Sequence, residues 1–246
     1  AAMTEPMAVA LHAVRRSRTK TSEPAIVIGC GSVGLGIILM LKATGVKKVI
    51  ASDYSASRRK LAERCGADIV INPANNSPFE NWKELGLLGN AAEALNYGLG
   101  IFDKIQSTGI PWWHAWRVVD KLGALPKRPV IFECVGVPGI LQHIIDGAPL
   151  FSKIVGVGVC MQSDRIEPAL AINKEIEMQF VLGYTPLEFR DALHMIAEGK
   201  IDCSPLITGI VGLDGVSNAF SALRDPEQHA KILIDPKKMG TDIMSK

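Results

Sequence analysis

Three closely spaced glycines follow the first short apolar run of the chain, in the pattern Gly29-x-Gly31-x-x-Gly34. The apolar run before them, 25–28, predicts a buried strand, and the apolar segment after them, 32–44, predicts a helix. In such a strand–turn–helix the first glycine permits a tight turn, and the third lets helix and strand pack closely. The second glycine lets a pyrophosphate approach the backbone, beside the free N–H groups that begin the helix. The glycine pattern alone is weak, because similar turns also serve packing.

Strands and helices alternate on both sides of this turn. The predicted strands are 25–28, 48–52, 68–71, 130–134, 153–159, 176–182 and 231–234, and the predicted helices are 6–18, 32–44, 55–65, 140–148, 187–198 and 213–223. Successive strand–helix–strand units imply a parallel sheet with right-handed crossovers. We therefore expect the α/β class, with a doubly wound parallel sheet of the Rossmann kind.

Residues 75–128 interrupt this alternation between the third and fourth strands. A polar loop opens the segment, several glycines follow, and an aromatic cluster, Trp-Trp-His-Ala-Trp at 112–116, comes near its end. We expect helices over part of 79–97 and over 112–122, so the segment is predicted as a helical insertion. The aromatic cluster either forms a lid or partner surface, or buries the insertion against the domain.

Asp53 follows the second predicted strand, 19 residues beyond Gly34. Dinucleotide-binding proteins carry an acid about 20 residues past the glycines, where it hydrogen-bonds a ribose. A carboxylate there also repels the 2′-phosphate of NADP, so the presence of Asp53 favours NAD over NADP. Asp53 could instead cap the helix predicted at 55–65. Arg58 and Arg59 either flank the adenosine or form a solvated surface, and NADP would bind if both faced a 2′-phosphate.

Composition and charge exclude other classes of protein. The chain has 246 residues, 48% of them hydrophobic, with 27 Lys and Arg against 25 Asp and Glu, a net charge of +2. This composition indicates a globular protein, and the charge argues against a nucleic-acid binder and against a polybasic membrane anchor. No apolar run reaches the roughly 18 residues of a membrane helix, and the N-terminus lacks a signal-peptide pattern. Five widely spaced cysteines fit neither a zinc motif nor a disulfide framework, so we expect reduced thiols in a cytoplasmic protein.

Several further stretches resemble one enzyme family. They are Glu5-Pro6-Met7-Ala8-Val9-Ala10-Leu11-His12-Ala13-Val14, Gly66-Ala67-Asp68, Ile71-Asn72-Pro73, Phe132-Glu133-Cys134-Val135-Gly136, and the runs 199–202, 205–208, 219–220 and 231–234. With the glycine turn and Asp53, they resemble the cofactor-binding part of the medium-chain, zinc-type alcohol dehydrogenase superfamily. The similarity is closest to the sorbitol and threonine dehydrogenase branch, and it covers nearly all of the chain except about 75–128.

The resemblance implies NAD as cofactor and a role for particular residues. The implied contacts are Gly29, Gly31, Ser32, Val33, Gly34 and Lys231 with the pyrophosphate, Asp53 with the ribose, Arg58 and Val135 beside the adenosine, and Val157, Gly158 and Val159 with the nicotinamide. The resemblance also implies that the edge strand 176–182 pairs between subunits of a homodimer or tetramer. Such pairing is physically reasonable, because an unpaired apolar edge promotes aggregation.

The resemblance implies zinc as well. In the family, zinc polarises the oxygen of an alcohol while hydride passes from the alcohol carbon to NAD. Glu5 matches a glutamate at the catalytic zinc of the polyol branch, and a carboxylate oxygen can bind zinc. Glu5 could instead be a first-turn residue favoured by the helix dipole. Because the family's other zinc ligands belong to an N-terminal domain with no match here, we expect no catalytic residues and no activity from this chain alone.

These expectations divide the chain into a hinge helix and linker (1–24), an NAD-binding domain (25–185) and a segment returning toward a catalytic domain (186–246). The expected function is NAD(H) binding within an alcohol or polyol dehydrogenase. A non-catalytic NAD(H)-binding module remains open, as does a quinone or enoyl reductase, although Asp53 and the Glu5-Pro6 stretch argue against the reductases. A methyltransferase that holds S-adenosylmethionine at the same glycine turn is the remaining alternative.

Overall fold

The computed structural model describes residues 1–80, 82, 84–106, 109–121 and 126–245. Within them, six parallel strands form one sheet in the order β3-β2-β1-β4-β5-β6. The strands are β1 (Ala25–Ile28), β2 (Val49–Ser52), β3 (Ile69–Ile71), β4 (Val130–Glu133), β5 (Lys153–Gly156) and β6 (Glu177–Phe180). The predicted doubly wound parallel sheet is therefore confirmed. The strand β5 ends three residues earlier than predicted, and β6 is shorter than predicted by one residue at its start and two at its end.

Strand β1 lies at the centre of the sheet, where it pairs with β2 on one side and with β4 on the other. At its carboxyl end, Ile28 is in register with Ser52 and with Glu133. Every residue of these three strands is buried, as expected for a parallel sheet covered on both faces. The strand order reverses between β1 and β4, and doubly wound sheets bind ligands in the crevice that such a reversal opens.

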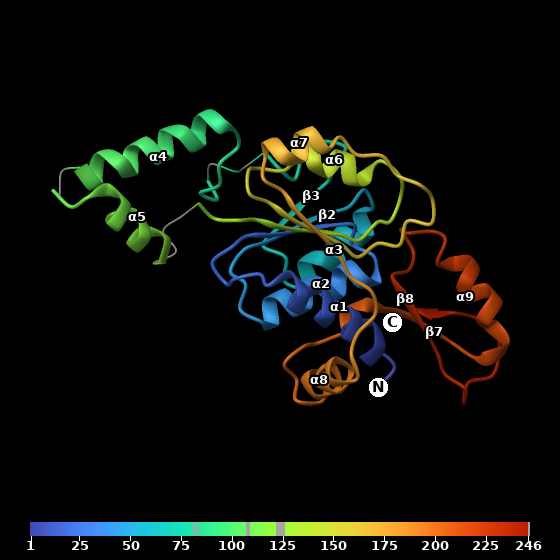
Figure 1. Ribbon diagram of the computed structural model, residues 1–246. Coiled ribbons are helices and arrows are strands. Elements are labelled where there is room, and N and C mark those ends of the chain that lie inside the picture. Colours follow the sequence, from blue (N-terminus) through green and yellow to red (C-terminus); the bar gives the residue numbers. More distant parts are fainter. Residues whose placement is uncertain (81, 83, 107–108, 122–125, 246) are drawn as a thin grey trace.

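Helices cover both faces of the sheet (Figure 1). One side carries α1 (Thr4–Ser17), α2 (Ser32–Ala43), α3 (Ala56–Arg64) and α8 (Pro186–Ala197), and the other carries α6 (Ile140–Gly147) and α7 (Pro168–Asn173). Two hydrophobic clusters match these two sides, with Met7 and Ile37 in the first and Ile131 and Ile144 in the second. The sequence pattern does not predict α7, because six residues are too few to show a helical period. No described helix has both the length and the apolar content needed to cross a bilayer.

A polar seam joins α1 to α8. At the start of α8, Thr185 Oγ1 accepts a hydrogen bond from the Glu188 N–H at 3.2 Å, and Glu188 Oε2 accepts one from the Thr185 N–H at 2.8 Å. The same Glu188 oxygen lies 2.9 Å from Nδ1 of His12, and Arg15 Nη2 donates to Asp191 Oδ2 at 2.7 Å. Burial raises the pKa of Glu188, but the hydrogen bonds from Thr185 and His12 outweigh it and hold that pKa below its usual value.

The insertion between β3 and β4 projects from the body of the molecule as two helices (Figure 1). They are α4 (Ala91–Gln106) and α5 (Trp112–Lys121). The predicted helix within 79–97 is thus correct only from residue 91 onward, and residues 81, 83 and 122 lie outside the described part of the chain. Phe79, in the loop before α4, is buried in the second hydrophobic cluster and anchors the segment to the sheet.

The aromatic cluster lies on α5. Trp112 packs against Phe102 of α4 with ring centroids 6.1 Å apart, and Trp113 packs edge-on against Trp112 at 5.9 Å. Trp112 and Trp113 are nevertheless 49% exposed each, whereas Trp116 is partly buried. Burial of the whole cluster against the domain is therefore wrong, and its role as a partner surface stays a prediction.

A second, smaller sheet follows α8. Within the described residues it has the order β8-β7-β9, formed by β7 (Ile207–Val211), β8 (Lys231–Ile234) and β9 (Met244–Ser245). Only β8 matches a predicted strand, because Gly209 interrupts the β-branched pattern of β7. The helix predicted at 213–223 divides at Gly215 into a 3₁₀ turn (Leu213–Gly215) and α9 (Val216–Ala222), and another 3₁₀ turn (Ser204–Leu206) precedes β7.

Gly34 tests the close packing of α2 on β1. A Cβ at this position would overlap the carbonyl oxygen of Gly29 and lie 3.4 Å from Val27 Cγ1. We expect Gly34→Ala to lower the free energy of unfolding by about 1–3 kcal/mol, because the obstructing atoms belong to backbone. Urea unfolding followed by circular dichroism measures this change. Gly98→Ala in α4 is the matched control, since a Cβ there has nothing within 4 Å, and an equal loss in both variants would contradict the packing role.

Glu188 tests the polar seam. A glutamate with a lowered pKa stabilises the folded protein above its unfolded-state pKa of about 4.3, and this contribution is lost as the pH falls through the folded-state pKa. We therefore expect Glu188→Gln to lower the melting temperature near neutral pH, and expect the difference from the wild type to shrink toward about pH 3. Differential scanning calorimetry measures both. Glu198→Gln, which removes an exposed partner of Lys200, should change little, and a pH-independent loss at Glu188 would argue against this role.

Candidate functional site

The glycine turn lies at the carboxyl end of β1. Gly29 has a φ of +90°, a conformation that favours glycine, and its N–H donates to the carbonyl of Ser52 at 2.8 Å. A Cβ on Gly29 would also lie 2.7 Å from Val135 Cγ2, so the turn passes close to the end of β4. A Cβ on Gly31, in contrast, would meet nothing within 4 Å. The backbone therefore remains open to a ligand at Gly31.

The start of α2 offers backbone donors beside this open position. Gly31 is the N-cap and provides no side chain, and the first helical hydrogen bond runs from the Leu35 N–H to the Gly31 carbonyl at 2.9 Å. Among the described residues, no hydrogen-bond acceptor faces the N–H groups of Ser32, Val33 and Gly34. Free N–H groups and the positive end of the helix dipole form a site for an anion such as a pyrophosphate.

Asp53 links the glycine turn to the start of α3. Its side chain is 9% exposed, with Oδ2 accepting from the Cys30 N–H at 2.7 Å and Oδ1 from the Ser55 N–H at 2.8 Å. Each carboxylate oxygen retains a second lone pair, so the group can still accept from ribose hydroxyls. The N-cap of α3 is Ser55, whose Oγ accepts from the Arg58 N–H at 3.1 Å. Asp53 therefore orients the turn before α3 and does not itself occupy the cap position.

The two arginines of α3 have different partners. Arg58 Nη1 lies 3.9 Å from Asp53 Oδ2, and its Nε is buried without a hydrogen-bond partner in the described structure. Arg59 Nη1 donates to the carbonyls of Asp53 at 2.9 Å and of Tyr54 at 2.6 Å. Arg58 thus faces the carboxylate, while Arg59 is bound to backbone.

Glu227 reaches the same helix from far along the chain. It lies in the loop between α9 and β8, and its Oε1 and Oε2 accept from the N–H groups of Ala56 and Ser57, both at 3.1 Å. Hydrogen bonds from Ser55 and from the Ser57 backbone lower the pKa of Glu227, so the carboxyl is ionised at neutral pH. Sequence reasoning missed this residue, because nothing in its local pattern relates it to α3.

Glu133 organises the carboxyl ends of β4 and β5. This buried carboxylate accepts through Oε1 from the N–H groups of Val135 at 2.6 Å and Gly136 at 2.7 Å. Its carbonyl accepts from the N–H groups of Val157 and Gly158, both at 2.9 Å. The Val157 bond continues the ladder that begins with the bond from the Lys153 N–H to the Pro129 carbonyl, and the Gly158 bond to the same acceptor marks where the ladder ends. Sequence reasoning noted Glu133 only within a family motif and assigned it no role.

The predicted residues after β4 and β5 lie at this same edge of the sheet. A Cβ on Gly158 would overlap the backbone N of Gly136, so the two turns touch backbone to backbone. Val135 is 43% exposed and Val159 68% exposed, which leaves apolar side chains free at the crevice. The structure therefore brings together the predicted residues of β1, β2, β4 and β5.

Cysteines near the site are protonated thiols. Burial, with a smaller effect from the Asp53 charge, raises the pKa of Cys30 to about 12. Burial and the Glu133 charge also raise the pKa of Cys134. All five cysteines of the chain are free, and Cys160 is among the two that are partly exposed.

Lys231 and Glu5 lie on other elements. Lys231 begins β8 in the second sheet, where its N–H donates to Thr208 Oγ1 at 3.3 Å. Glu5 is exposed in the first turn of α1. No group of three or more His, Cys, Asp or Glu able to hold a metal occurs among the described residues, so Glu5 has no partner ligands there. The roles predicted for Lys231 and Glu5 stay predictions.

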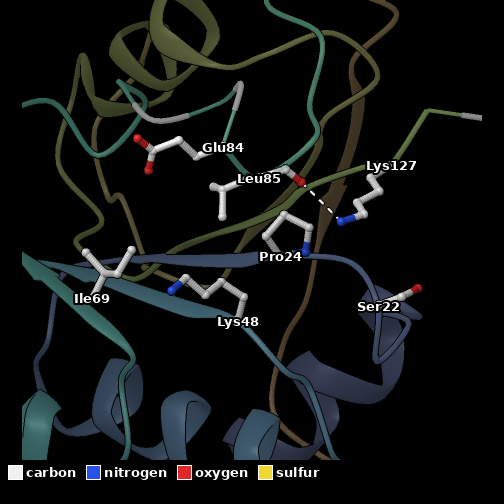
Figure 2. A pocket seen from close by; sticks show the side chains of 7 residues that line it. All are labelled: Ser22, Pro24, Lys48, Ile69, Glu84, Leu85 and Lys127. Carbon is white, nitrogen blue, oxygen red and sulfur yellow. Dashed lines mark hydrogen bonds between the residues drawn. The ribbon is translucent and has the colours of Figure 1, made fainter.

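A separate cavity of about 310 Å³ opens at the amino ends of the strands, opposite the carboxyl ends that carry the glycine turn (Figure 2). Ser22, Pro24 and Lys48 precede β1 and β2, which places the cavity at the amino ends of the strands. Its upper wall comes from the insertion, and Lys127 Nζ donates to the Leu85 carbonyl at 3.2 Å (Figure 2). The cavity is therefore distinct from the crevice at the glycine turn.

Comparison with known proteins agrees with this geometry. The family model for "zinc-binding dehydrogenase" matches residues 32–198. (R,R)-butanediol dehydrogenase of Bacillus subtilis is 29% identical over 236 residues, which cover 96% of this chain and 57% of that relative. The crystal structure of 2R,3R-butanediol dehydrogenase from Bacillus subtilis, at 28% identity, superposes with a TM-score of 0.70 over 96% of this chain and 57% of that one.

Other relatives are named for polyols. Sorbitol dehydrogenase of Bos taurus is 27% identical over 220 residues, which cover 89% of this chain and 51% of the relative. Erythritol/L-threitol dehydrogenase of Mycolicibacterium smegmatis is 42% identical over 127 residues, which cover 52% of this chain and 31% of the relative. The chain spans about half the length of the first two relatives, and the resemblance to the sorbitol dehydrogenase branch is confirmed. Since the family model matches more than half of the sequence, the chain belongs to the zinc-binding dehydrogenase family.

Proposed function

We propose that this chain is the NAD(H)-binding part of a dehydrogenase that transfers hydride between a small alcohol or polyol and the cofactor. The observation that carries the proposal is the unobstructed helix start at Gly31, next to the Asp53 carboxylate. The pyrophosphate would bind the free N–H groups of α2, and the ribose hydroxyls would donate to Asp53. When bound, the nicotinamide supplies the carbon that accepts or donates the hydride.

The remaining predicted contacts follow the carboxyl edge of the sheet. Exposed Val135 would provide an apolar wall on the adenosine side, and the backbone of 157–159 would orient the nicotinamide. Arg58, already beside Asp53, would lie near the adenosine. Lys231 would reach the pyrophosphate from the second sheet. Each of these roles is part of the proposal.

The alcohol or polyol class rests on the relatives, which are named for butanediol, sorbitol and erythritol or threitol. Membership of the dehydrogenase family counts against a methyltransferase. It leaves open a non-catalytic NAD(H)-binding module, and the binding experiment below does not depend on turnover. For zinc, Glu5 by itself does not make up a site, because no group of three or more metal-ligating side chains occurs among the described residues.

In the proposed organisation, residues 1–24 form a hinge helix and linker and residues 25–185 form the NAD-binding domain. Residues 186–246 form a segment that returns toward a catalytic domain. The seam between His12 and Glu188 supports a link between the first and third of these parts. For assembly, we favour a homodimer or tetramer through β6, since Phe180 is 66% exposed on this edge strand. A reducing, cytoplasmic location fits the five free thiols.

Asp53 tests the ribose contact. We expect Asp53→Ala to weaken NADH binding at least about tenfold, because hydrogen bonds to a charged group contribute roughly 1.5–3 kcal/mol. Quenching of tryptophan fluorescence or enhancement of NADH fluorescence measures the dissociation constant.

Asp68→Ala is the matched control for this variant. Asp68 is also a carboxylate that accepts a backbone hydrogen bond, from the Val49 N–H at 2.7 Å, and it pairs with Lys42. It lies at the amino ends of β2 and β3, away from the glycine turn. We expect its NADH affinity to equal that of the wild type. A wild type that does not bind NADH would overturn the proposed function, and equal losses in both variants would overturn the ribose contact.

A further inference from the structure

Two carboxylates occupy the first turn of α3. Asp53 accepts from the Ser55 N–H at 2.8 Å, and Glu227 accepts from the next two N–H groups, those of Ala56 and Ser57. The hydroxyl of Ser55 accepts from the fourth N–H, that of residue 58. All four donors at this helix start are thus engaged within the chain, in contrast to the free donors at the start of α2.

Glu227 is held in place from both sides. Its own N–H donates to Asp225 Oδ1 at 2.9 Å, and the carbonyl of the preceding residue, Pro226, accepts from Ser55 Oγ at 3.2 Å. The contact joins the loop before β8 to the start of α3, about 170 residues earlier in the chain. The negative charge of Glu227 is therefore fixed beside the turn that carries Asp53.

Two cations that could bind a phosphate, Arg58 and Arg59, lie at the same turn, but both already contact other groups there. Arg59 Nη1 is bound to two backbone carbonyls, and Arg58 Nη1 lies 3.9 Å from Asp53 Oδ2. A 2′-phosphate on the adenosine ribose would sit next to Asp53, where it would face two carboxylates and no free N–H group of α3. The uncharged 2′-hydroxyl of NAD meets no such repulsion and can donate to Asp53.

We propose that Glu227 is a second specificity-determining residue, which acts with Asp53 to reject the 2′-phosphate of NADP. This inference rests on the proposed NAD(H) site. It assigns to the loop before β8 a share in cofactor choice, in addition to its contact with α3. Removal of the Glu227 charge leaves Asp53 as the single carboxylate against the phosphate, so the repulsion that the phosphate meets is smaller.

The test is the ratio of the dissociation constants for NADPH and NADH, measured by fluorescence titration of the full chain. Glu227→Gln keeps an acceptor for the helix N–H groups and removes the charge. We expect this ratio to fall by up to about fivefold, the effect of removing one like charge at about 4 Å in water. The ratio in the wild type should also fall as salt is raised, because exposed charges are screened.

Glu80→Gln is the matched control, since Glu80 is an exposed glutamate whose Oε1 also accepts from backbone, at 3.1 Å from the Ser77 N–H. Its ratio should equal that of the wild type. If Glu227→Gln weakens both cofactors equally or changes neither, Glu227 is a structural cap and the inference is overturned. If Glu227→Gln does not fold, a salt-independent ratio in the wild type overturns it. Failure of the wild type to bind NADH overturns the proposed function instead.

Discussion

The pairing of β1 with β2 on one side and β4 on the other determines the rest of the structure. Parallel pairing brings the carboxyl ends of these strands to one edge, and each of the turns that follow must therefore lie beside the others. Because the order of strands reverses at β1, the helices that leave β1 and β4 cover opposite faces of the sheet. The glycine turn lies in the resulting crevice, and the apolar core on both faces keeps it in place.

Carboxylates then hold the loops at this edge. Asp53 binds the glycine turn and the turn before α3, Glu133 binds the turn after β4, and Glu227 binds the start of α3. Each accepts two backbone N–H groups, a common way to satisfy donors at the ends of strands and helices. These acids occupy the N–H donors of the turns after β2 and β4 and of the start of α3, whereas none of the described residues accepts from the first N–H groups of α2. The free donors for an anion at this edge therefore lie at the start of α2.

Much of the fold followed from local patterns. The apolar runs at 25–28 and 231–234 coincide with β1 and β8, and the spacing from Gly34 to Asp53 correctly placed the acid beside the turn. Predictions failed where tertiary contacts decide the chain's path. The strand predicted at 153–159 ends at Gly156, and the Gly158 N–H returns to the Glu133 carbonyl that already accepts from Val157, a contact that no pattern near β5 indicates.

The sequence by itself determined the class of fold, the glycine turn and the acid that serves it, because short apolar runs, glycine conformations and residue spacing are local properties. It could not place Glu227 on α3, show which donors remain free, or separate the environments of Arg58 and Arg59. Those features depend on contacts between segments as much as 171 residues apart. Only the packed sheet brings such segments together, so only the tertiary structure decided which charges surround the site.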